Sequence, residues 1–82
     1  MYTITKQNKD GYDFHGLIDT TGQEVIPHIH KDPREAIAEV IYLLKMNQKQ
    51  IGNRKFLAVD PSTEEIEEIE RELLEQVSGI YP

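Results

Sequence analysis

The sequence contains no cysteine, no tryptophan and no long apolar segment. Without cysteine, the chain cannot form a disulfide or hold a metal through thiolates, and this composition is typical of a reducing, cytosolic setting. The longest uncharged apolar run, Val40–Leu44, covers five residues, whereas a membrane-spanning helix needs about 20. The first residues also lack the basic and apolar regions of a signal peptide. We therefore expect a soluble cytoplasmic protein with no membrane segment.

Positive charge is also scarce. The chain has 9 Lys and Arg against 15 Asp and Glu, which gives a formal net charge of -6. Proteins bind nucleic acids and anionic membrane surfaces through basic faces, so we expect direct binding to neither. A chain of 82 residues is long enough for one domain with a modest core, so residues 1–82 are interpreted as a single domain. Association with a further subunit would add stability to so small a core.

The sequence also lacks the residue patterns of catalytic sites. No cysteine nucleophile is present, and Ser62 and Ser78 lie at an expected helix start and near the end of the chain. No glycine-rich loop precedes a helix, where it could bind phosphate. The many carboxylates near the C-terminus should face water, whereas general acid–base catalysis uses groups in a perturbed environment. The sequence therefore favours a non-enzymatic protein that uses no cofactor.

Four short segments have the alternating, β-branched or aromatic composition of strands. They are residues 2–7, 12–19, 23–30 and 55–59. Asp10-Gly11 predicts a tight turn between the first two, and Thr20-Thr21-Gly22 predicts another before the third. We therefore expect an antiparallel sheet of three to four strands.

A first helix is expected to begin at Asp32-Pro33, where Asp32 can cap and Pro33 suits the first helical position. Glu35 lies in capping-box register with Asp32. Gly52 is the residue at which this first helix is expected to end. Apolar residues then repeat at helical spacing along one broad stripe, formed by Ala36, Ile37, Val40, Ile41, Leu43, Leu44 and Met46.

A second helix is expected at roughly residues 62–77, and Gly79 is expected to end it. Two residues could cap its N-terminus: Asp60, with Pro61 at the first helical position, or Ser62, paired with Glu65. Its apolar seam is Ile66, Ile69, Leu73 and Val77. The expected fold is α+β, with both helices packed on the antiparallel three- to four-stranded sheet and the element order βββαβα.

The second helix holds the whole net charge of the chain. From Glu64 to Glu75 there are seven glutamates and one arginine, a net of -6, while the other residues hold eight acidic and eight basic side chains. Exposed glutamates favour helix formation and solubility, but like charges at this spacing also repel one another. Two interpretations follow: a solvated face, or a partner surface. The residues expected on that surface are Glu67, Glu68, Glu72 and Glu75.

His28 and His30 form the other feature with chemical potential, because residues two apart on a strand share a face. If Thr21-Gly22 is a two-residue turn, His15 lies opposite His28 and Asp13 lies opposite His30, which places three histidines and one aspartate on one face as candidate zinc ligands. The apolar residues Phe14, Ile18, Val25 and Ile29 then share the other face.

If Thr20-Thr21-Gly22 is instead a three-residue turn with a left-handed glycine, Asp19 pairs with Gln23 and His15 moves to the face opposite His28. Turn chemistry favours this second register, because threonine disfavours positive φ. Apolar patterning favours the first. The sequence leaves the choice open.

The function expected from these features is a small regulatory or interaction protein that contacts a protein partner through the acidic helix, the sheet face, or both. One alternative is a metal-binding protein that uses His15, His28 and His30. Another is an inhibitor that mimics the charge of nucleic acid. Basic residues around the end of the first helix, such as Lys45 and Lys49, also suggest self-association with the acidic helix of a second copy.

Overall fold

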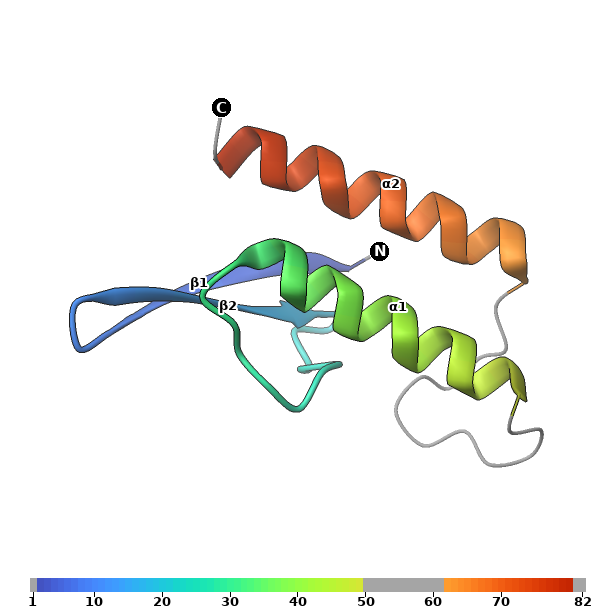
Figure 1. The fold of residues 1–82 in the computed structure, drawn as a ribbon, viewed down its shortest axis with the longest axis horizontal. Helices are drawn as coiled ribbons and strands as arrows, with labels where there is room; N and C mark the ends of the chain where they lie inside the picture. The colour runs from blue at the N-terminus through green and yellow to red at the C-terminus, as the bar shows by residue number, and fades with distance from the viewer. Residues whose placement is uncertain (1, 50–61, 81–82) are drawn as a thin grey trace.

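The computed structural model describes residues 2–49 and 62–80 (Figure 1). These residues form strands β1 (Thr3–Lys9) and β2 (Tyr12–Ile18), followed by helices α1 (Pro33–Lys49) and α2 (Thr63–Ile80). The two strands pair antiparallel. The helices lie side by side in opposite directions, with α1 packed on β2 and α2 packed on β1 (Figure 1). Neither helix of the described residues is long and apolar enough to cross a membrane.

The α+β class is correct, but the expected three- to four-stranded sheet and the order βββαβα are wrong: the described elements run ββαα around a two-stranded sheet. Residues 23–30 form no strand, and their backbone pairs with β2 at only two isolated bridges, Ile18 with Glu24 and His15 with His30. The two bridges are three residues apart on β2, from His15 to Ile18, but six residues apart on the segment that follows, from Glu24 to His30. The surplus residues cannot pair, and Pro27 among them has no N–H to donate to a ladder.

Sequence signals between neighbouring residues set the turn between β1 and β2 and the start of α1. Asp10 and Gly11 both have positive φ, 56° and 85°, and form the predicted two-residue turn between the paired residues Lys9 and Tyr12. At the start of α1, the Arg34 N–H donates to the Asp32 carboxylate at 2.9 Å, which confirms the expected cap. The expected fourth strand, residues 55–59, and the expected helix stop at Gly52 lie outside the described residues.

Of the two caps that the sequence left open for α2, the structure has Ser62 with Glu65. The Glu65 N–H donates to Ser62 Oγ at 3.2 Å, and the Ser62 N–H donates back to the Glu65 carboxylate at 3.4 Å. This reciprocal pair is a capping box. The prediction that Gly79 ends this helix is wrong, because α2 continues through Gly79 to Ile80.

The core lies between the sheet and the two helices. Most residues of the predicted apolar stripes of both helices are buried in it, while Leu43, Met46 and Ile69 are half-buried. One residue from each strand and two from the loop that follows β2 complete the core. The buried apolar residues are Ile4, Leu17, Val25, Ile26, Ala36, Ile37, Val40, Ile41, Leu44, Ile66, Leu73 and Val77. The helices therefore turn their opposite faces to solvent.

Gln76 fastens α2 to the free edge of β1. Its side-chain oxygen accepts from the Ile4 N–H at 3.0 Å, and its side-chain nitrogen donates to the Tyr2 carbonyl at 2.9 Å. The amide thus takes the place of a peptide group in a neighbouring strand and satisfies two backbone groups of an edge that would otherwise be open.

Replacing Gln76 with alanine is expected to lower the free energy of unfolding by about 1–3 kcal/mol, because it leaves these two partly buried backbone groups without partners. Urea unfolding followed by circular dichroism measures the loss. Glu75→Ala, an exposed neighbour on the same helix, is the control and should change stability by less than about 0.5 kcal/mol. Equal losses in the two variants would show that the Gln76 contacts contribute nothing.

Candidate functional site

The outer side of α2 carries a band of glutamates for which residues 2–49 and 62–80 show no ion pair. Glu64, Glu67, Glu68 and Glu75 are exposed and Glu72 is half-buried; we call these five residues the acidic face. Within residues 2–49 and 62–80, no ion pair joins any of them to a lysine, arginine or histidine. The four residues predicted as a partner surface all belong to this face, and three of them are exposed.

Several of these carboxylates face one another along the helix. Glu64, Glu68 and Glu72 follow at intervals of four residues, and Glu75 lies three residues beyond. Such neighbours repel one another by a few tenths of a kcal/mol per pair. The core does not use these side chains, since the buried seam of α2 lies on the other side of the helix. The acidic face therefore raises the energy of the isolated domain slightly, and an approaching cation would relieve that repulsion.

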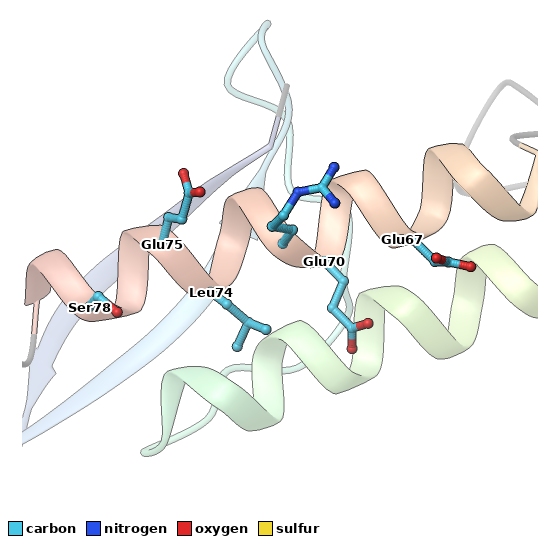
Figure 2. Close-up of a pocket in the computed structure, with 6 residues that line it drawn as sticks. Glu67, Glu70, Leu74, Glu75 and Ser78 are labelled. Carbon is cyan, nitrogen blue, oxygen red and sulfur yellow. The ribbon is translucent and has the colours of Figure 1, made fainter.

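A shallow hollow runs along the flank of α2 (Figure 2). It has a volume of about 420 Å³, and we call it the α2 groove. Glu70 and Leu74 point from it toward the side on which α1 lies, whereas Glu75 points away (Figure 2). Leu74 is 45% exposed and is one of the few large apolar side chains on the described surface. The residues lining the groove are Glu67, Glu70, Arg71, Leu74, Glu75 and Ser78.

The turn after β2 decides between the two registers that the sequence left open for the histidines. The Asp19 N–H donates to the Gln23 carbonyl at 3.0 Å, and Gly22 has a φ of 86°. The three-residue turn is therefore the one that forms, as turn chemistry predicted. Leu17 is buried and Phe14 and Ile18 are only half-buried, so the apolar face expected from the other register is wrong.

The three histidines predicted as metal ligands lie in different surroundings. His15 is fully buried, and its Nδ1 lies 3.2 Å from the Lys31 carbonyl. Its backbone pairs with that of His30 rather than His28. Asp13, the fourth residue of the predicted cluster, contacts Asn8 at 3.1 Å and Lys6 at 3.4 Å on β1. The Asn8 hydrogen bond, with a smaller contribution from Lys6, lowers the pKa of Asp13.

His28 and His30 converge on Glu39 of α1, a residue that the sequence analysis did not single out. His28 Nδ1 and His30 Nε2 each lie 2.7 Å from a different oxygen of this carboxylate. We call these three residues the histidine–Glu39 clamp. Burial alone raises the pKa of Glu39, but the hydrogen bonds and charges of the two histidines together outweigh it and hold the pKa below its ordinary value.

The clamp holds the loop after β2 against the second turn of α1 through these two contacts. Both oxygens of Glu39 are already engaged by the two rings, and its side chain is only 16% exposed. Among the residues that the structure describes, no group of three or more His, Asp or Glu side chains has the arrangement of a metal site. Metal binding by His15, His28 and His30 thus stays a prediction from the sequence.

The sequence held a weak signal for Glu39: an acidic residue in the second turn of a helix that begins three residues after His30. A glutamate on a helix is usually solvated, so only the packing of the loop on α1 identifies it.

Comparison with models of protein families, with curated proteins and with solved structures finds no match to this chain.

Proposed function

We propose that this chain is a small non-enzymatic interaction protein that binds a basic protein partner through the acidic face of α2. The observation that carries this proposal is that none of these glutamates forms an ion pair within the described residues. A domain that used its charge only for stability would gain more from interspersed lysines at i,i+4 spacing. A cationic partner surface supplies the missing charges instead.

The electrostatics of such a contact favour rapid and selective association. A single-sign surface steers an oppositely charged partner during diffusion, and it repels anionic competitors. The contact energy of exposed ion pairs is small, so the affinity must also come from apolar contacts. Leu74 lies beside the acidic face and offers one such contact.

Capture experiments at two salt concentrations test this function. The intact protein is used as bait in lysate of the organism that encodes it, at about 0.1 M and about 1 M salt, where the screening lengths are about 10 Å and 3 Å. A quadruple variant carries Glu67→Gln, Glu68→Gln, Glu72→Gln and Glu75→Gln. We expect the wild type to capture a basic protein at low salt only, and the variant to lose at least about nine-tenths of it. Equal capture by both baits at both salts would contradict the proposal.

The same experiment separates two alternatives from the main proposal. If the captured protein is a nucleic-acid-binding protein that free DNA displaces, the acidic face acts as a mimic of phosphate charge. If the chain is a metal-binding protein, zinc titration should shift the NMR signals of His15, His28 and His30 at stoichiometric metal. An unchanged histidine spectrum removes that alternative. A second copy of the chain is a further partner, reached through the α2 groove, which shares Glu67 and Glu75 with the acidic face.

A further inference from the structure

We infer that the outer surface of the helix layer binds a second copy of this chain, with α1 of each copy packed against α2 of the other. This contact goes beyond the acidic face, because it uses the α2 groove together with a stripe on α1. Both surfaces belong to the same layer of two neighbouring helices (Figure 1). A two-fold axis can therefore form the same contact twice.

The stripe on α1 is basic and apolar. Arg34, Ala38, Tyr42 and Lys45 are all exposed and repeat at helical spacing along one exposed side of α1, which borders the buried Ile41. We call them the basic stripe. Tyr42, between Ala38 and Lys45 in this stripe, is 62% exposed, the largest value among the large apolar side chains of the described surface. An exposed aromatic residue flanked by cations is typical of an interface anchor.

The α2 groove has the opposite charge and a matching apolar centre. Leu74 lies in the groove, with Glu67 and Glu70 on one side of it along the helix and Ser78 on the other (Figure 2). The hollow of about 420 Å³ has room for a tyrosine side chain. Each surface thus has an apolar centre with a charged border, which is the usual anatomy of a protein interface.

The two surfaces complement each other. Packing Tyr42 of one copy on Leu74 of the other buries two exposed apolar side chains and brings cations of the basic stripe to the glutamates of the groove. Because the chain carries both halves, no other protein is needed to complete the contact. A second copy also adds a buried layer to a domain of only 82 residues, whose own core is small.

Sedimentation equilibrium of the intact chain tests this inference. The expected particle is a dimer of 2 × 9.5 = 19 kDa, formed at protein concentrations up to about 1 mM, which covers even weak association. Tyr42→Ala and Leu74→Ala should each raise the dimer dissociation constant about 10- to 30-fold. Tyr12→Ala, which removes a tyrosine of similar exposure from the hairpin, should leave it unchanged.

Charge reversal provides a second, independent test. One variant carries Arg34→Glu and Lys45→Glu, so that both helix surfaces are acidic. The other carries Glu67→Lys and Glu70→Lys, so that both are basic. Each variant alone should be monomeric, because its two surfaces repel those of an identical copy. Mixed in equal amounts, the two should form a heterodimer, since every α1–α2 contact then joins opposite charges.

Two results would overturn the inference. A wild-type protein that stays at 9.5 kDa throughout the concentration range shows that the groove does not bind a second copy, even if the acidic face still captures a basic partner. Dimerisation of both charge-reversed variants as strong as that of the wild type shows that the dimer uses another surface. Circular dichroism confirms that every variant retains its helices.

Discussion

Replacing Leu73 with alanine is expected to lower the free energy of unfolding by about 2–5 kcal/mol, the largest effect of any single change considered for this protein. Leu73 is 1% exposed and lies at the centre of the buried seam of α2. Its removal leaves a cavity between α2 and the rest of the core, because neighbouring side chains fill such a space only in part. A domain of this size has a total stability of about 4–12 kcal/mol.

Leu74→Ala is the matched control for this change. The two leucines are neighbours in the sequence, but Leu74 is 45% exposed. Under conditions that keep the protein monomeric, truncating it should cost less than about 0.5 kcal/mol. Urea unfolding measures both variants, and thermal unfolding should show a midpoint roughly 10–20 °C lower for Leu73→Ala. Similar losses in the two variants would mean that the seam does not face the core as the structure shows.

The second large effect is expected at the histidine–Glu39 clamp. Glu39→Gln keeps the size of the side chain but removes the charge that both histidines contact at 2.7 Å. Hydrogen bonds to charged groups contribute about 1.5–3 kcal/mol when buried, but the His28 side chain is 70% exposed, so its share is small. We therefore expect a loss of about 2 kcal/mol near pH 7.

The pH dependence of this loss identifies its cause. The pKa of Glu39 is lowered in the folded protein, so its carboxylate contributes stability above its ordinary pKa, and that contribution is lost as the pH falls through the lower folded value. The difference in unfolding free energy between wild type and Glu39→Gln should therefore be present at pH 7 and shrink at pH values below about 4.

Glu35→Gln is the control for the clamp. Glu35 is exposed and lies 3.9 Å from His30 Nδ1, the ring nitrogen that does not contact Glu39. Its replacement should cost less than about 0.5 kcal/mol at either pH. If the Glu39→Gln difference were the same at pH 7 and at pH 3.5, it would come from packing of the side chain and not from its charge.

The parts of this fold that could be predicted from sequence are those set by neighbouring residues. The Asp10-Gly11 turn, the Asp32 cap and the helical apolar stripes each depend on residues a few positions apart, and the structure has all three. The turn at Thr20-Thr21-Gly22 also followed from local chemistry. Apolar alternation conflicted with it and was misleading, because Leu17 and not Phe14 or Ile18 faces the core.

The failed predictions about the sheet and the histidines depend on contacts between distant residues. Residues 23–30 have the composition of a strand, yet they bulge away between two bridges to β2 because six residues there span only three. That bulge brings His28 and His30 to Glu39 of α1, and it pairs the His15 backbone with His30 instead of His28. Strand propensity gives no information about such a register change, since it is set by how the loop packs on the helix.

The central claim, that the acidic face binds a basic partner, is tested most directly with two charge-matched baits. Glu68→Gln with Glu75→Gln changes the acidic face, and Asp10→Asn with Glu24→Gln changes exposed acids elsewhere; each pair takes the net charge from -6 to -6 + 2 = -4. We predict that at about 0.1 M salt the first bait captures several-fold less basic partner than the second, which matches the wild type. Equal capture by the two baits would show that only net charge matters and would contradict the claim.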